Sequence, residues 1–182
     1  MGESFLIFAL KSFYLMLPAY FANMAPVIVK RINLFAFPID FNKKIENTPI
    51  LGRNKTFRGV IFGVIFAIII AYLQHLAYNM GFFHAISFMD YQNWLLFGFL
   101  MGLGALVGDL AKSFFKRRIG IKPGSKFVTF DQTDFVVGAL IFIIPVFQVT
   151  LAIFIVSLLL SFALHIMVNH IAFYLKIRGE KW

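Results

Sequence analysis

Four long apolar stretches constrain the fold of this chain more than any other feature. They run from Phe5 to Val29, from Val60 to Tyr78, from Trp94 to about Phe115 and from Phe135 to about Leu175. The hydrocarbon core of a bilayer is about 30 Å thick, and a helix of about 20 apolar residues crosses it. Each stretch is therefore long enough to form at least one membrane span.

The composition excludes the other fold classes. Of 182 residues, 60% are hydrophobic and 14% are charged, whereas about 25% are charged in an average soluble domain. A soluble domain of this size could not bury so much apolar surface. Cys is absent, which excludes a disulfide-stapled domain and Cys-type metal sites. We expect a single all-α integral membrane domain, residues 1–182, in the cell membrane.

The last apolar stretch is predicted to form two spans, because a single helix of that length would extend roughly 60 Å. Pro145, Gln148 and Thr150 interrupt it, so the break is expected there. The resulting fourth span, Phe135 to Phe147, is short. A short span indicates that its polar start is sunk below the membrane surface, against protein or a water-filled cavity. The prediction is therefore five transmembrane helices.

The basic residues predict the orientation, because cytoplasmic loops carry an excess of Lys and Arg. All but Lys11 fall in two loops and the C-terminal tail: Lys30, Arg31, Lys43, Lys44, Arg53, Lys55 and Arg58; Lys112, Lys116, Arg117, Arg118, Lys122 and Lys126; Lys176, Arg178 and Lys181. We expect the N-terminus outside, the C-terminus in the cytoplasm, and two large cytoplasmic loops that form the active site. Lys11 either snorkels to the outer surface or acts inside the bundle. No basic residue precedes the first span, so a cleaved signal peptide is not expected.

The second basic loop begins with a polar stripe. Asp109, Lys112, Ser113 and Lys116 have the spacing of one helix face. A carboxylate, two ammonium groups and a hydroxyl would then lie together at the cytoplasmic end of the third span. Asp109 could instead simply pair with Lys112 or Ser113, which would lower its cost at the membrane edge.

Two further acids, Asp131 and Asp134, open the fourth span. Either could cap that helix. If the third and fourth spans pack together, these acids and Asp109 form a cation site. Mg²⁺ prefers oxygen ligands, typically one or two carboxylates plus substrate phosphates. Carboxylates for Mg²⁺ beside Lys and Arg for phosphate are the groups that phosphoryl-type transfer needs.

Two loop segments are candidates for anion contact. At Pro123-Gly124 a turn would let backbone N–H groups approach an anion, although such a pair is often only a turn. Lys55-Thr56 resembles the end of a P-loop, but the required glycine spacing and the preceding strand are absent. We reject a P-loop there and retain a cationic phosphate contact. The positive-inside bias alone would also explain the basic loops.

The motifs from Gly108 to Phe135 resemble those of the CDP-archaeol synthase family of membrane CTP transferases. They are Gly108-Asp109-x-x-Lys112-Ser113-x-x-Lys116-Arg117, Ile121-Lys122-Pro123-Gly124 and Asp131-Gln132-x-Asp134-Phe135. Leu17-Pro18-Ala19-Tyr20 with Asn23, and Lys55-Thr56-x-Arg58-Gly59, also resemble family motifs. The chain lacks the His-Gly-Gly segment of the related CDP-diacylglycerol synthases, and Pro123 follows Lys122 where they have Asp. These departures favour the archaeol branch.

The resemblance implies a reaction of CTP with a lipid phosphate, unsaturated archaetidic acid in the archaeal branch, to give a CDP-lipid and pyrophosphate. It implies that Mg²⁺ is held by Asp109 and Asp131, with Asp134 as a third candidate. The residues implied to bind CTP phosphates are Lys112, Lys116, Arg117 and Lys122, with Ser113 orienting an oxygen and Gly124 in the adjoining turn. The residues implied to line the same cavity are Asn23, Lys55, Thr56 and Arg58. Partners are therefore CTP, a lipid phosphate and the membrane, with no nucleic acid.

Other polar and small residues are expected to be structural. Gly59-x-x-x-Gly63, Gly98-x-x-x-Gly102 and Gly104-x-x-x-Gly108 have the spacing that lets helices approach closely. A polar stripe on the fifth span is expected to face protein and form interhelical hydrogen bonds; it consists of Ser157, Ser161, His165 and Asn169.

Three alternative functions make different demands on the sequence. A CDP-alcohol phosphotransferase needs Asp-Gly followed by acids four apart, but here the order is Gly108-Asp109 and the later acids are three apart. A phosphatidate cytidylyltransferase would act on ester lipids by the same chemistry. A small transporter with a basic cytoplasmic mouth would need neither a catalytic carboxylate cluster nor CTP.

Overall fold

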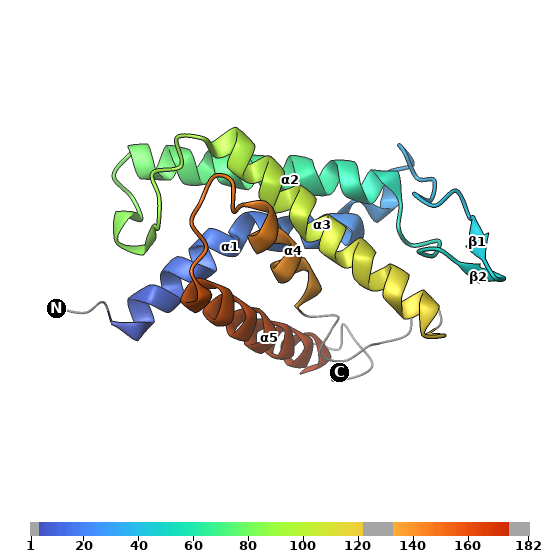
Figure 1. Ribbon diagram of the computed structural model, residues 1–182. Helices are drawn as coiled ribbons and strands as arrows, with labels where there is room; N and C mark the ends of the chain where they lie inside the picture. The colour runs from blue at the N-terminus through green and yellow to red at the C-terminus, as the bar shows by residue number, and fades with distance from the viewer. Residues whose placement is uncertain (1–3, 122–132, 175–182) are drawn as a thin grey trace.

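The protein is a bundle of helices in the computed structural model, which describes residues 4–121 and 133–174 (Figure 1). The helices are α1 (Phe5–Ile28), α2 (Phe57–Asn79), α3 (Trp94–Arg118), α4 (Asp134–Phe142) and α5 (Leu151–Tyr174). The structure adds a small antiparallel hairpin that the sequence did not predict, formed by β1 (Lys44–Ile45) and β2 (Thr48–Pro49). Short 3-10 turns cover Val29–Arg31 and His84–Ile86.

The helix starts follow from side-chain caps. Ser4 accepts a hydrogen bond from the N–H of Ile7 at the start of α1, and Thr56 accepts one from the N–H of Gly59 at the start of α2. Both side chains satisfy N–H groups that have no partner within the helix. The third helix continues to Arg118, three residues beyond the predicted end, so its last turn is basic.

Within residues 4–121 and 133–174, four helices are long and apolar enough to cross a membrane, namely α1, α2, α3 and α5. These helices agree in position with four of the five predicted spans. The predicted fourth span, Phe135 to Phe147, was too long, because helix α4 ends at Phe142 and has 9 residues. Its length of about 14 Å is about half of the hydrocarbon thickness. Pro145 explains the early end, since it cannot donate to the helix and disfavours helical geometry at the residue before it.

The loop between α1 and α2 and the basic last turn of α3 lie at one end of the bundle. There α1 ends, α2 begins and α3 ends, next to the hairpin (Figure 1). We call it the basic end; the opposite end carries the loop between α2 and α3. At that opposite end the Lys11 ammonium lies 5.6 Å from the ring centroid of Phe88, a residue of this loop. This contact agrees with the expectation that Lys11 reaches toward the surface that we predict to be outside.

The third helix is the centre of the packing, because it contacts α1, α2 and α4. The buried core includes Leu15 and Met16 of α1, Phe97 and Met101 of α3, and Leu140 of α4. The small-residue spacings lie at these contacts, as predicted. Gly98 and Gly102 face α2, whereas Gly104 and Gly108 face α4.

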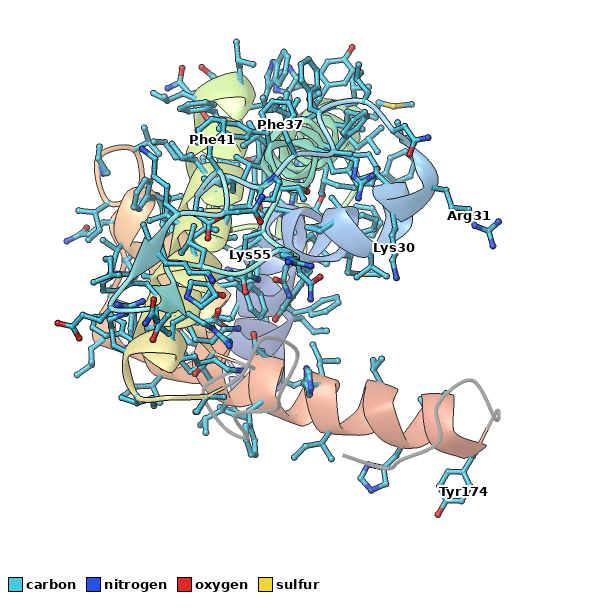
Figure 2. The ribbon with its side chains drawn as sticks, turned by 90° about the vertical axis from the view of Figure 1, so that its right-hand side faces the viewer. Lys30, Arg31, Phe37, Phe41, Lys55 and Tyr174 are labelled. Carbon is cyan, nitrogen blue, oxygen red and sulfur yellow. The ribbon has the colours of Figure 1, made fainter. Side chains whose placement is uncertain are left out.

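The last helix packs on α1 and α4. The hydroxyl groups of Tyr20 and Ser161 are 2.8 Å apart, which confirms one predicted interhelical hydrogen bond. Ser157 of the same stripe is fully buried. The C-terminal part of α5 projects away from the other helices, with Tyr174 near its far end (Figure 2). The side chain of Asn169, the last member of the predicted stripe, lies outside the described residues.

Candidate active site

Helix α4 approaches α3 at a distance that only glycine permits. A Cβ atom on Gly108 would lie 2.2 Å from the carbonyl oxygen of Asp134, and one on Gly138 would lie 2.1 Å from that of Gly104. Any larger residue would push the two backbones apart. This close approach brings Asp134, the first residue of α4, beside Lys112 of α3.

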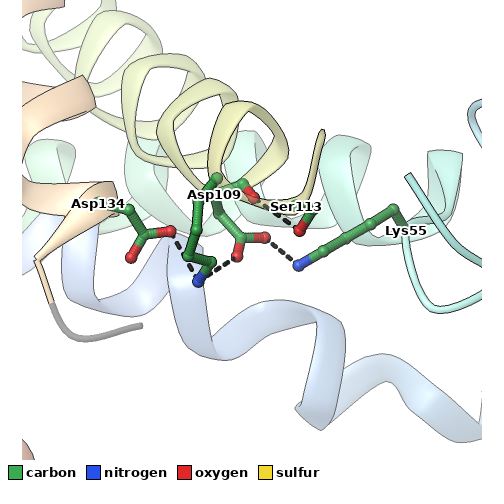
Figure 3. Close-up of polar contacts among 5 residues, drawn as sticks. Lys55, Asp109, Ser113 and Asp134 are labelled. Atoms are coloured by element: carbon green, nitrogen blue, oxygen red, sulfur yellow. Dashed lines mark hydrogen bonds and ion pairs between the residues drawn. The ribbon is translucent and has the colours of Figure 1, made fainter. Parts of the chain in front are cut away.

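Four charged side chains form a chain of ion pairs at this contact (Figure 3). The Lys112 ammonium lies 3.1 Å from Asp109 Oδ1 and 2.8 Å from Asp134 Oδ2. The second oxygen of Asp109 accepts a hydrogen bond from the Lys55 ammonium. We call these four residues the charge cluster. It joins α3, α4 and the residue that precedes the cap of α2.

The charge cluster is largely removed from solvent. The side chains of Asp134, Lys112, Asp109 and Lys55 are exposed by 9%, 14%, 15% and 26%. Charges at membrane depth are tolerated when they are paired, and two ammonium groups here balance two carboxylates. Both oxygens of Asp134 are buried, and the carboxylate interacts with the Lys112 ammonium and the Phe135 N–H, which leaves part of its acceptor capacity of about four lone pairs unused. Asp134 can therefore accept a further donor or cation.

A small pocket of about 30 Å³ opens beside Lys55 and Asp109, and we call it the polar pocket after the four polar residues in its wall, Asn54, Lys55, Thr56 and Asp109. It lies where α1, α2 and α3 meet at the basic end. The remaining lining residues come from these helices and from the loop after α1: Pro26, Ile39, Gly59, Val60, Leu106 and Leu110.

A larger and mostly apolar groove of about 620 Å³ lies between α3 and α4. Lys112, Thr133 and Asp134 are its polar residues. The others are apolar or glycine: Val107, Gly108, Ala111, Phe115, Val137, Gly138, Ile141 and Phe142. We call it the α3–α4 groove. It offers apolar surface next to an ammonium group, which suits an amphiphile with an anionic head.

The stripe predicted on α3 is present. Asp109 does pair with Lys112, the simpler alternative, but Lys112 also reaches Asp134 on another helix. The Ser113 hydroxyl donates to the carbonyl oxygen of Asp109 at 2.9 Å. Lys116 and Arg117 are buried, and Arg117 donates to the carbonyl oxygen of Ile121. These side chains continue the stripe toward the C-terminal end of α3.

The residues predicted on the first two spans fall into two groups. Thr56 lines the polar pocket with Lys55 while it caps α2. Arg58 instead donates to the carbonyl oxygen of Ile32. Asn23 is half-buried and lies one turn before Pro26. Within the described part of the chain, neither Arg58 nor Asn23 lines this pocket.

Part of the predicted site lies outside the described residues, namely Asp131, Lys122 and Gly124. The three-aspartate Mg²⁺ site therefore stays a prediction. In residues 4–121 and 133–174 there is no group of three His, Cys, Asp or Glu that could hold a metal ion. Thr133 occupies the cap position of α4, without a side-chain cap hydrogen bond. Asp134 stands in the first turn, where a negative charge meets the positive end of the helix dipole.

The donor atoms that are present fit Mg²⁺. Asp109 and Asp134 supply carboxylate oxygens, and the oxygens of Asp134 are short of donors among the described residues. Sites for Mg²⁺ in proteins commonly use one or two carboxylates, with substrate phosphates and water completing the shell. Two carboxylates beside a pocket lined by the Lys55 ammonium are consistent with that pattern.

Sequence reasoning missed Asp40 and the α3–α4 groove. Asp40 is a buried acid in the loop between α1 and α2, where it accepts hydrogen bonds from backbone N–H groups. Its neighbour Asn42 was a usable signal, since Asp and Asn mark turns in which side chains bind nearby backbone. The groove left no pattern in the sequence, because it depends on how α4 is tilted against α3.

Comparisons with known proteins agree over nearly the whole chain. A family model described as CarS-like CDP-archaeol synthase matches residues 5–182. A protein named CDP-archaeol synthase from Methanococcus aeolicus is 33% identical over 98% of this chain and 99% of its own length. One of the same name from Pyrococcus furiosus is 34% identical over 95% of this chain and 98% of its own. A solved structure, described as an intramembrane enzyme for archaeal membrane lipids biosynthesis, is 30% identical with a TM-score of 0.71; the match covers 86% of this chain and 90% of that one.

Proposed function

Since the chain belongs to the CDP-archaeol synthase family, a family of nucleotidyltransferases, we propose that it transfers the cytidylyl group of CTP to unsaturated archaetidic acid. The acceptor is 2,3-bis-O-geranylgeranylglycerol 1-phosphate, and the products are a CDP-archaeol lipid and pyrophosphate. In this proposal residues 1–182 form one domain in the cytoplasmic membrane, with the N-terminus outside and the active site on the cytoplasmic side.

The strongest support for this proposal is the position of the charge cluster. The charge cluster lies between a polar pocket and an apolar groove, and it contributes residues to both. A reaction between a water-soluble nucleotide and a membrane lipid needs such a meeting point, because its two substrates come from different solvents. We place CTP on the polar-pocket side and the lipid chains in the α3–α4 groove.

The chemistry requires charge neutralisation more than proton transfer. An oxygen of the lipid phosphate attacks the α-phosphorus of CTP, the bond from that phosphorus to the bridging oxygen of the β-phosphate breaks, and pyrophosphate leaves. The attacking phosphate is already an anion, so no general base is needed. The barrier is the repulsion between two anions, which preorganised cations lower.

The cationic residues have the following proposed roles. Lys55 and Lys112 bind phosphate oxygens, with Lys116, Arg117 and Lys122 around the triphosphate. Ser113 orients an oxygen through its free lone pairs, and the turn at Gly124 offers backbone N–H groups. Thr56, Arg58 and Asn23 complete the cavity from α1 and α2.

The proposed metal ligands are Asp109 and Asp131, with Asp134 as the third candidate. Bound Mg²⁺ supplies positive charge that stabilises the transferring phosphoryl group. Within the chain itself, Asp109 holds the ammonium groups of Lys55 and Lys112. Removal of Asp109 would therefore disturb phosphate binding as well as metal binding.

The test is turnover of radiolabelled CTP by the purified chain with Mg²⁺ and a mixture of ether and ester lipid phosphates. We expect chloroform-soluble label and an equal amount of pyrophosphate, with the isoprenoid ether lipid preferred. Asp109→Asn should lower the rate by about 10²–10³-fold, the loss typical when one electrostatic contact to the transition state is removed. Asp90→Asn, in the loop at the opposite end, is the matched control and should keep the wild-type rate.

The same assay decides between the alternatives. Equal use of ester and ether lipids would indicate a phosphatidate cytidylyltransferase. Absence of pyrophosphate with every lipid tested would leave the transporter interpretation. Wild-type rates from a normally expressed Asp131→Asn variant would contradict its metal role.

A further inference from the structure

Asp40 has no assigned role in the proposed reaction, yet its carboxylate organises the loop that carries Lys55. It is 8% exposed. One carboxylate oxygen accepts from the N–H of Asn42 at 3.0 Å, and the other accepts from the N–H groups of Leu51 at 2.9 Å and Gly52 at 3.1 Å. A single side chain thus holds two separate parts of the loop together.

The segment that Asp40 holds leads directly to Lys55. The carbonyl oxygen of Gly52 accepts from the N–H of Lys55 at 3.1 Å. The carbonyl oxygen of Lys55 accepts from the N–H of Ile39, next to Asp40, at 2.9 Å. The backbone of Lys55 is therefore fixed on both sides by groups that adjoin the Asp40 carboxylate. Beyond this frame the Lys55 ammonium reaches Asp109.

The backbone at Gly52 is adapted to this arrangement. Its φ is 113°, in a region that residues with a side chain rarely adopt. This conformation lets the N–H groups of Leu51 and Gly52 converge on one carboxylate oxygen. Successive N–H groups arranged in this way form a concave anion site, which here is filled by the protein's own carboxylate. An amide at position 40 would place its N–H₂ group against these donors or lose an acceptor.

We propose that Asp40 is a positioning residue for cytidylyl transfer, which holds residues 51–55 so that the Lys55 ammonium stays at Asp109 in the charge cluster. This inference rests on the proposed function. Figure 2 looks at the basic end and shows Lys55 directed toward the middle of the bundle, whereas Lys30 and Arg31 stand at its edge. Without the hydrogen bonds to the Asp40 carboxylate, the backbone at Lys55 would shift. The flexible Lys55 side chain would then no longer be held at Asp109.

A double-mutant cycle tests whether Asp40 acts through Lys55. The variants are Asp40→Asn, Lys55→Met and the double variant, with kcat/KM for CTP as the readout. We expect Asp40→Asn to lower kcat/KM about tenfold, since misplacing a positioned group by a fraction of an ångström has effects of this order. In the Lys55→Met background Asp40→Asn should cause no further loss. A full additional tenfold loss, or a wild-type rate from Asp40→Asn alone, would overturn the proposal.

Two further variants separate positioning from general stability. Asp90→Asn is the control, because Asp90 also accepts a backbone N–H, that of Gln92 at 3.1 Å, but at the opposite end of the bundle; its kcat/KM should not change. Gly52→Ala keeps Asp40 but strains the backbone, and it should reproduce the Asp40→Asn loss and the same non-additivity with Lys55→Met. If Asp40→Asn does not fold, the comparison of Gly52→Ala with Lys55→Met provides the same test.

Hydrogen exchange gives a readout that does not depend on activity. The amides of Leu51 and Gly52 should exchange at least about tenfold faster in Asp40→Asn than in the wild type, because they lose a charged acceptor. Amides of α5 should exchange at the same rate in both proteins. Unchanged exchange at Leu51 and Gly52 would overturn the proposed frame even if the enzyme is active. Conversely, a wild-type protein without CTP turnover would overturn the proposed function while this measurement still tests the frame.

Discussion

Lys112 places one positive charge between two carboxylates that come from different helices. Its distances to Asp109 and Asp134 are both within ion-pair range, and all three side chains are mostly buried. Neither carboxylate could stay charged with so little exposure to solvent unless a cation lay nearby. The lysine therefore has a structural role in joining α3 and α4, in addition to its proposed role toward phosphate.

Replacing Lys112 should reveal this structural role. Lys112→Met leaves Asp109 and Asp134 facing each other without the cation between them, and unpaired buried charges typically cost about 3–5 kcal/mol. We expect a clear drop in the thermal unfolding midpoint of the detergent-solubilised protein. Lys30→Met, at an exposed position, is the control and should unfold near the wild-type temperature. Equal midpoints for Lys112→Met and the wild type would contradict the structural role.

The Asp40 carboxyl should make loop stability depend on pH. Burial by itself raises the pKa of Asp40, but hydrogen bonds from backbone N–H groups outweigh burial and hold the pKa below its ordinary value of 3.8. A lowered folded-state pKa means that the ionised group stabilises the fold above pH 3.8, and that this contribution is lost as the pH falls through the folded-state pKa. The difference in unfolding midpoint between wild type and Asp40→Asn should thus be largest near neutral pH and shrink below pH 3.8. A difference that does not change with pH would show that charge is unimportant there.

At the scale of elements, the contact between α3 and α4 decides whether the site exists. The short α4 adds only 9 residues to the bundle, but it delivers Asp134 and one wall of the α3–α4 groove. Both depend on glycines at which the two backbones nearly touch. A helix that approached through larger side chains would leave Asp134 too far from Lys112.

A pair of Gly→Ala variants tests this contact. In Gly138→Ala the new methyl group would meet the α3 backbone, at the carbonyl oxygen of Gly104. Gly98→Ala is similarly crowded but faces α2, with its Cβ 2.8 Å from that of Ala71. Overpacking typically costs about 1–3 kcal/mol, so both variants should be less stable. Only Gly138→Ala should also lose CTP turnover per folded molecule, and equal losses in both would contradict a specific role of α4.

For the whole molecule, the main prediction is the orientation in the membrane. The loop between α1 and α2 and the basic last turn of α3 lie at one end of the bundle, and the loop between α2 and α3 lies at the other (Figure 1). The positive-inside rule then places the basic end in the cytoplasm. The fourth crossing needs more than α4, which is too short to span the bilayer, so the residues up to Thr150 must complete the return.

Single cysteines can map this orientation, because the native chain contains none. We expect Gln92→Cys and Gln148→Cys to react with a membrane-impermeant maleimide in intact cells, since both lie in loops on the predicted outer side. Glu46→Cys, in the hairpin at the basic end, should react only after lysis. All three native side chains are exposed. Labelling of Glu46→Cys in intact cells would reverse the orientation, and failure of Gln148→Cys alone would refute the fourth crossing.

Most of the helices could be predicted from the sequence, because the apolar character of neighbouring residues determines where they form. The apolar runs predicted α1, α2, α3 and α5, since a chain in lipid must satisfy its backbone within a helix. The break at Pro145 to Thr150 follows from proline chemistry, although the length of α4 was overestimated. The polar stripe from Asp109 on α3 was visible for the same reason, because helix spacing fixes which residues share a face.

The sequence by itself determined the class of the protein, its helices, the stripe on α3 and the family that its motifs resemble. Only the tertiary structure decided that Lys112 bridges Asp109 to Asp134, that Lys55 rather than Arg58 reaches the same carboxylate, and that Asp40 frames the Lys55 loop. The physical reason is the sequence separation of the groups that interact. Helix formation depends on residues within a few positions of each other, whereas these contacts join groups up to 54 positions apart and depend on how closely the glycine faces let the helices pack.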